Sequence, residues 1–181
     1  MARVSDVPPE KVPADVRDTY LRYANGYGAF RNQVGVFAHV PSSVRHLMGM
    51  LLELREQQNV PFRYIELAIV TVSKLNECHY CVAHHAPLLN IEGISAAGAE
   101  RILDYETHPE FDEVDKLVVE YAMQVTNTPQ RIRDSVFERL RKHFTEPQIV
   151  ELTLRISLCG FFNRFNDALM IDAEPHASAH L

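Results

Sequence analysis

Two cysteines and a histidine lie close together near the middle of the chain. Cys78 and Cys81 enclose His79 and Tyr80, and His85 follows four residues after Cys81. On a helix, at about 100° per residue, Cys78, Cys81 and His85 project onto one side. Two thiols at this spacing can form a disulfide, and a second thiol can trap a sulfenic acid formed on the first. A nearby imidazole can accept the thiol proton, and a helix N-terminus stabilises the resulting thiolate. The segment therefore predicts thiol redox chemistry.

A carboxylate upstream, Glu66, is the fourth candidate site residue. It belongs to a strongly apolar segment, 62–76. The polar residues of this segment and Glu77 fall on one narrow stripe at helical spacing: Arg63, Glu66, Ser73, Lys74 and Glu77. The segment is therefore expected to be a nearly buried helix with a single polar seam. Glu66 could orient His85 and raise its basicity, as a carboxylate does in a catalytic triad. The alternative is that Glu66 simply lies on a water-facing stripe.

Other uses of the Cys-x-x-Cys pair are weaker. With His85 the pair would supply three zinc ligands, but no second Cys/His pair has zinc-finger spacing. A c-type haem site would need a histidine directly after Cys81, where this chain has Val82. A thioredoxin-like site would need strands that alternate with helices. We predict no metal and no cofactor, and we expect Cys159 to be a small buried apolar residue.

Helical spacing of apolar residues runs through most of the sequence and predicts an all-α fold. The expected helices are 14–24, 42–56 with Ser42 as cap, 62–76, 78–90, 95–103 with Ser95 as cap, 111–126, 132–143, and one from Thr145 towards Asp172. Residues 1–13 are expected to form an arm, 14–173 the helical domain and 174–181 a flexible tail.

Composition excludes several function classes. The chain has 181 residues and a net charge of −6, which argues against nucleic acid as a partner. A group of five cations, Arg131 to Lys142, alternates with acidic residues and is expected to form a solvated helix face. No apolar run is long enough for a membrane helix, and residues 1–15 do not resemble a signal peptide. We expect a cytoplasmic protein with reduced cysteines.

The spacing of Glu66, Cys78, Cys81 and His85 resembles the signature of the carboxymuconolactone decarboxylase-like superfamily, on its alkylhydroperoxidase D (AhpD) side. The resemblance covers roughly residues 35–172. It implies an all-α, AhpD-like fold that assembles into trimers, or into hexamers as trimers of dimers. It also implies that the paired cysteines reduce peroxides and are re-reduced by a thiol or a lipoylated protein. The matching glutamate and histidine would form a proton relay. One position departs from the pattern, because Tyr80 stands where that enzyme has a second relay histidine.

The first hypothesis is therefore a peroxidase or disulfide reductase that acts on a peroxide or another small molecule. Cys81 is expected to attack the peroxide, and Cys78, nearer the surface, to resolve the intermediate and exchange with a partner. Decarboxylases of the superfamily do not depend on the cysteine pair, so its presence favours the redox branch. The alternatives are a lactone or carbon-acid enzyme that uses His85 and Glu66, and a non-catalytic helical oligomer with a bound metal. Apolar residues crowd the last helix and predict a homo-oligomer: Phe161, Phe162, Phe165, Leu169 and Met170.

Overall fold

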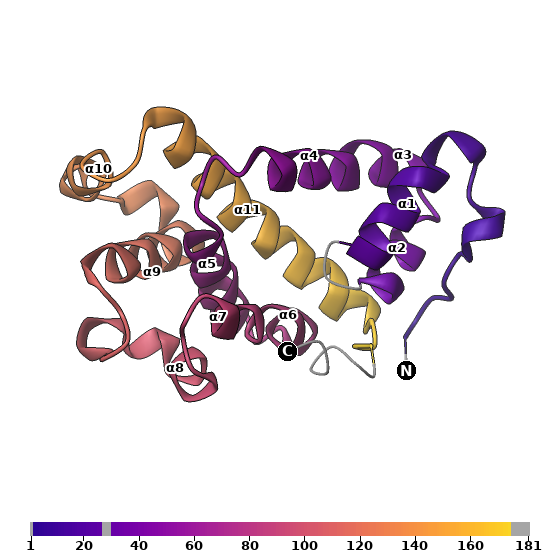
Figure 1. Cartoon of the computed structure of the whole chain (residues 1–181). Coiled ribbons are helices and arrows are strands. Elements are labelled where there is room, and N and C mark those ends of the chain that lie inside the picture. The colour runs from indigo at the N-terminus through magenta and orange to yellow at the C-terminus, as the bar shows by residue number, and fades with distance from the viewer. Residues whose placement is uncertain (1, 27–29, 175–181) are drawn as a thin grey trace. The chain divides into compact units, whose positions relative to one another are not determined.

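The computed structural model describes residues 2–26 and 30–174, and every regular element in these ranges is helical (Figure 1). The α-helices are α1 (Ala14–Gly26), α2 (Arg31–Phe37), α3 (Pro41–Ser43), α4 (Gly49–Gln57), α5 (Phe62–Leu75), α6 (His79–His85), α7 (Leu88–Ile91), α8 (Ala96–Glu100), α9 (Glu113–Asn127), α10 (Asp134–Leu140) and α11 (Glu146–Leu169). The predicted all-α class is confirmed. None of the helices in the described ranges has the length and apolarity needed to cross a membrane.

The chain divides into two compact units. Of the described residues, one unit contains 2–26, 30–59 and 166–174, and the other is Val60–Phe165. In the first unit α1 packs against α2 and against a π-helical segment, Val44–Met48. The last turn of α11 is tied to α2 because the Gln33 side chain donates a hydrogen bond of 3.0 Å to Asn166 Oδ1.

The N-terminal segment is also anchored inside the first unit. The Arg3 backbone N–H donates to the Leu169 carbonyl at 2.8 Å, and the Val7 N–H donates to the Gly35 carbonyl at 3.0 Å. Glu174, the first residue of the predicted tail, accepts a hydrogen bond from the Asn32 backbone N–H at 2.7 Å. The rest of that tail, 175–181, and Met1 of the predicted arm lie outside the described residues. The predicted division into arm, domain and tail therefore stays a prediction.

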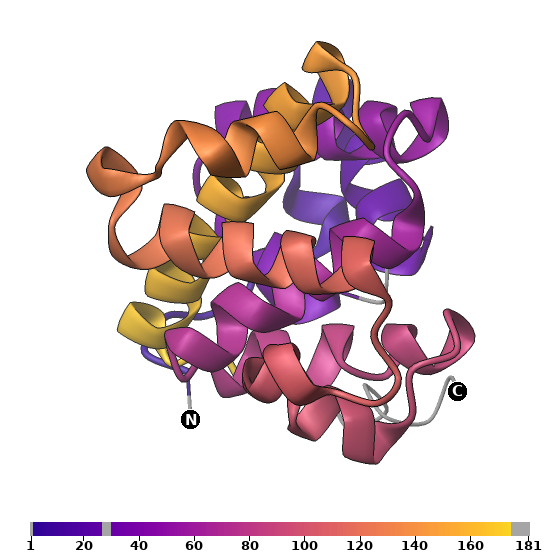
Figure 2. The same cartoon turned by 90° about the vertical axis from the view of Figure 1, so that its left-hand side faces the viewer.

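The second unit is built around α5, which packs against α9 and α6. Residues Ile65 to Ser73 of α5 are all buried, as expected for an apolar helix with one polar seam. Figure 2 shows α9 crossing this unit between α10 and the segment that carries α7 and α8. Most of the core side chains are aliphatic, and Tyr121, Phe111 and Phe144 add aromatic volume.

Two of the predicted helix starts are confirmed by their caps. Ser95 Oγ accepts a hydrogen bond from the Gly98 N–H at 2.9 Å and begins α8. The Gln148 side chain accepts from the Thr145 N–H at 2.8 Å and begins α11. In both cases a side chain partners a polar group that the first helical turn would otherwise leave exposed.

Several predicted boundaries are wrong, and three of them have a local cause. The second helix begins at Pro41, directly after Val40, and Ser42 does not cap it. The helix predicted as 111–126 begins at Glu113, because Asp112 forms a capping box with Asp115. The helix predicted as 78–90 is two helices, α6 and α7, with Pro87 directly before α7. Proline has no N–H for the hydrogen-bond ladder and its ring disfavours a helix interior, which explains the break.

Candidate active site

The two predicted redox cysteines lie side by side at the start of α6. Cys78 is the residue directly before the helix, and Cys81 lies in its first turn. Their sulfur atoms are 3.0 Å apart, and both residues are free thiols. Cys78 is fully buried and Cys81 is 5% exposed. The expectation that Cys78 lies nearer the surface is therefore wrong, because the turn before α6 packs its side chain into the interior.

A tight turn after α5 sets the position of Cys78. The backbone of Glu77 is left-handed, with φ of 56°. The Cys78 N–H donates to the Ser73 carbonyl at 3.0 Å, and the Glu77 N–H donates to the Lys74 carbonyl at 3.2 Å. These two bonds define a Schellman motif, which ends α5 and turns the chain sharply. A non-glycine residue in this conformation is strained, so the surrounding structure must hold the turn that delivers the first thiol.

Glu66 and His85 form the second part of the site. Glu66 Oε2 and His85 Nδ1 are 2.8 Å apart, and the side chains are 3% and 12% exposed. An ionised carboxylate can only accept, so in this pair Nδ1 donates and a neutral imidazole keeps its lone pair at Nε2. Glu66 therefore does not lie on a water-facing stripe. It is a buried side chain of α5 that orients a histidine of α6.

A buried polar cluster connects α11 to the end of α5, just before the thiols. The Asn76 side chain donates to Asn163 Oδ1 at 2.8 Å, and Asn163 Nδ2 donates to Ser73 Oγ at 3.3 Å. Ser73 Oγ is also 3.3 Å from Cys159 Sγ. Ser73 and Asn163 are completely buried. Because Ser73 also accepts the Cys78 N–H through its carbonyl, this cluster supports the turn that places Cys78.

Cys159 is buried, as expected, and it differs chemically from a reactive cysteine. Burial raises the pKa of its thiol to about 12, so the thiol stays protonated at neutral pH. A protonated thiol is a poor nucleophile. The third cysteine of the chain is therefore a packing residue with a polar contact.

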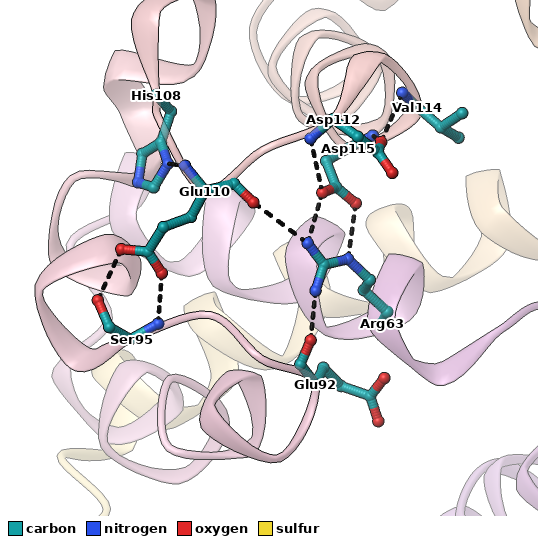
Figure 3. A network of polar contacts seen from close by, with 8 residues as sticks. All are labelled: Arg63, Glu92, Ser95, His108, Glu110, Asp112, Val114 and Asp115. Carbon is teal, nitrogen blue, oxygen red and sulfur yellow. Dashed lines mark hydrogen bonds and ion pairs between the residues drawn. The ribbon is translucent and has the colours of Figure 1, made fainter.

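Arg63 fixes the beginning of α5, the helix that carries Glu66 (Figure 3). Its guanidinium group forms a bidentate ion pair with Asp115 of α9, with distances of 2.9 Å from Nε and 2.5 Å from Nη2. It also donates to the Glu92 carbonyl, in the loop after α7. Asp115 is fully buried and also accepts the Asp112 N–H at 3.1 Å. One arginine thus links three segments of the second unit and fixes α5 against α9.

Sequence reasoning missed part of this arrangement. Arg63, Ser73 and Lys74 were expected on a polar seam, but no partner could be assigned to any of them. The partners Asp115, Asn163 and Glu100 lie 26 to 90 residues away along the chain. The sequence offers one signal for such a buried contact: a polar residue such as Asn163 at a helical position where the spacing predicts an apolar side chain.

The other residues of the motif serve packing or lie at the surface. Tyr80 is buried and stacks on His84, with ring centroids 4.3 Å apart. His84 Nδ1 lies 2.8 Å from the Tyr80 carbonyl oxygen. His79 is exposed. Within the described residues, no group of three or more His, Cys, Asp or Glu side chains is arranged to hold a metal ion.

The structural comparisons find solved proteins that share the fold of this chain over nearly its whole length. No protein-family model matches the chain. The uncharacterized protein YnjA of Escherichia coli is 24% identical over 169 residues, which is 92% of each chain. A solved AhpD-core structure, an uncharacterized peroxidase-related protein from Ralstonia eutropha, superposes with a TM-score of 0.84 at 21% identity, over 97% of this chain and 94% of that one. A cysteine-to-alanine variant of the debrominase Bmp8, in complex with 2,3,4-tribromopyrrole, gives a TM-score of 0.80 at 15% identity, over 99% and 97%.

Proposed function

Because the chain has the AhpD-like fold predicted from its sequence, we propose that it is a thiol-dependent oxidoreductase that reduces a peroxide or a similar small oxidant. The observation that carries this proposal is the 3.0 Å separation of the Cys78 and Cys81 sulfurs at the start of α6, the helix whose last residue, His85, pairs with Glu66 of α5. Two thiols this close can give two electrons to one substrate and end as a disulfide. The buried carboxylate keeps the imidazole in one tautomer, ready to accept and return a proton.

In the proposed reaction Cys81 is the attacking thiol. His85, one helical turn further along α6, takes the Cys81 proton, and the thiolate attacks the outer peroxide oxygen. The O–O bond breaks, Cys81 becomes a sulfenic acid, and the leaving alkoxide takes the proton from His85. The Cys78 thiol then attacks the Cys81 sulfur, which forms the disulfide and releases water. The complete burial of Cys78 suits this resolving step better than contact with a partner.

An external dithiol must return the two electrons. A thiol or a lipoylated protein would attack the disulfide and leave both cysteines reduced. We place the reductant at Cys81, the more exposed of the two cysteine residues. The predicted homo-oligomer remains part of the proposal, since Phe161 and Met170 are 45% and 48% exposed in the single chain.

Thiol titration before and after addition of peroxide tests the function. One equivalent of peroxide should remove two free thiols, and peptide mass mapping should find a Cys78–Cys81 disulfide with Cys159 still reduced. Cys81→Ser should abolish peroxide consumption, whereas Cys78→Ser should leave a sulfenic acid that a dimedone probe labels. Cys159→Ser is the matched control and should behave like the wild type. If peroxide leaves Cys78 and Cys81 reduced, the peroxidase proposal fails.

A second candidate substrate class comes from the similarity to the debrominase Bmp8. A dithiol can supply the two electrons that replace a carbon–bromine bond by carbon–hydrogen, with release of bromide and a proton and formation of the disulfide. Incubation of the reduced protein with 2,3,4-tribromopyrrole should then release bromide in proportion to thiol loss. Bromide release without thiol loss, or no release at all, would exclude this substrate class.

A further inference from the structure

The Val60–Phe165 unit contains a pocket whose lining residues, Glu120 to Arg139, include none of the candidate redox site. It is a cavity of about 410 Å³, lined by residues of α9, of α10 and of the segment that joins these two helices. Figure 1 shows where α9 and α10 lie in the fold. Three arginines line the cavity: Arg131, Arg133 and Arg139. Cavities of this volume are typical of sites for one small molecule. Such a concentration of positive charge is unusual in a chain whose net charge is −6.

The only carboxylate among the residues that line the cavity is already engaged. Arg139 Nη2 donates to Glu120 Oε2 at 2.6 Å, and the Gln124 side chain donates to Glu120 Oε1 at 3.0 Å. Both oxygens of Glu120 therefore have a donor of their own. Glu120 pairs with Arg139, and among the described residues the other two arginines of the pocket form no ion pair.

The remaining polar groups are hydrogen-bond donors without an acceptor. Among the residues that the structure describes, the guanidinium groups of Arg131 and Arg133 make no hydrogen bond or ion pair, and the same holds for the hydroxyls of Thr128 and Ser135. Two arginines and two hydroxyl-bearing residues thus line one cavity. The five cations are exposed, as expected for a solvated face. Three of them also line a common cavity, because the short connection between α9 and α10 carries Arg131 and Arg133 to the pocket that Arg139 lines.

We propose that this pocket binds the phosphate group of a small organic ligand. Arginine pairs with phosphate through two parallel N–H···O bonds, and its charge persists at every physiological pH. A phosphate monoester carries three acceptor oxygens and a charge near −2. This matches two arginines and two hydroxyls better than a carboxylate, which has two oxygens and a single charge. The cavity is also larger than the phosphate itself, so an organic group can enter with it.

Isothermal titration of the reduced full-length protein with phenyl phosphate tests this site without any redox readout. We expect one molecule per chain, with a dissociation constant of about 1 mM or tighter. The double variant Arg131→Gln/Arg133→Gln should weaken binding by at least about tenfold, because it removes the charge-assisted hydrogen bonds of two arginines to the phosphate. Both side chains are exposed, so the double variant should keep the wild-type melting temperature.

The matched control is Arg141→Gln/Lys142→Gln, which removes the same charge from exposed neighbours that do not line the cavity. It should bind phenyl phosphate within about twofold of the wild type, as expected for surface substitutions. Equal weakening in the control and the pocket variant would show charge screening alone and overturn the site. Absence of binding to the wild type at millimolar phenyl phosphate would also overturn it, and equal affinity for benzoate would overturn the phosphate assignment. Since no peroxide is present, none of these results depends on the proposed peroxidase activity.

Discussion

Replacement of Glu66 by glutamine separates a proton relay from ordinary packing. Glutamine is nearly the same size, and its side-chain carbonyl can still accept the 2.8 Å hydrogen bond from His85 Nδ1. The substitution therefore keeps the position of the imidazole and removes only the negative charge. If that charge makes His85 a better base, Glu66→Gln should slow the reaction of the cysteine pair with peroxide at neutral pH.

The magnitude follows from the geometry of the pair. A hydrogen bond to a charged partner contributes about 1.5–3 kcal/mol and a neutral one about 0.5–1.5 kcal/mol, a difference of roughly 1–1.5 kcal/mol. That is about a tenfold change in rate. The side chains are only 3% and 12% exposed, so water screens the charge poorly and the loss can approach about a hundredfold. We therefore expect a ten- to hundredfold loss, within the range of general acid–base catalysis.

Stopped-flow measurement of thiol loss against pH provides the assay. The rate of Glu66→Gln should recover in part at high pH, where the thiolate forms without help from His85. His85→Ala should lose at least as much, and the double variant should lose little more, because the two residues act as one unit. Glu113→Gln, with a side chain 91% exposed on α9, is the charge-matched control and should leave the rate unchanged.

An unchanged rate and pH profile in Glu66→Gln, with the fold intact by circular dichroism, would refute this reasoning. The pair would then be a structural contact between α5 and α6. Additive losses in the double variant would also contradict a shared role.

Three further predictions concern stability. Burial raises the pKa of the Cys159 thiol from 9.0 to about 12, so between these pH values the thiol loses its proton in the unfolded chain but keeps it in the folded protein. The free energy of unfolding of the wild type should therefore fall by about 1.4 kcal/mol per pH unit above pH 9, and urea unfolding of Cys159→Ala should not show this contribution. Asn163→Leu should lower the free energy of unfolding by about 1–3 kcal/mol, because it leaves the buried polar partners of Asn163 without a hydrogen bond. Asn127→Leu, at an exposed position, should change it by no more than about 0.5 kcal/mol, and equal losses in the two variants would contradict a role for the buried cluster. Glu77→Gly should stabilise the folded protein by about 0.5–1 kcal/mol, because glycine adopts the φ of 56° without strain. Glu138→Gly, inside α10, should destabilise it by about 1 kcal/mol, so thermal unfolding should show opposite shifts of the melting temperature.

The helices themselves follow closely from local sequence. The buried character of α5 follows from a continuous apolar segment interrupted at helical intervals by single polar residues. Ser95 and Thr145 begin their helices because their local hydrogen bonds need only residues three positions away. Boundaries failed where a single local signal was overlooked, as at Pro87, or where the wrong residue was taken as the cap, as at Ser42.

The partners of the polar seam on α5 could not be obtained in this way. Helical periodicity places Glu66 on the seam but cannot distinguish water from His85 as its neighbour. The same limit applies to Arg63, whose partner Asp115 follows 52 residues later. Periodicity describes one helix at a time, and each of these bonds joins two helices.

The sequence by itself determined the all-helical class, the pairing of Cys78 with Cys81 on one helical face and the placement of His85 one turn further on. These properties depend on residues within about one or two turns, where backbone geometry alone fixes the spacing. Only the tertiary structure decided that Glu66 is buried against His85, that Cys78 is the more deeply buried cysteine, and that Arg131 and Arg133 line one pocket with Arg139. Burial and electrostatic environment depend on what packs against a residue from distant parts of the chain, and the periodicity of a single helix carries no information about that neighbour.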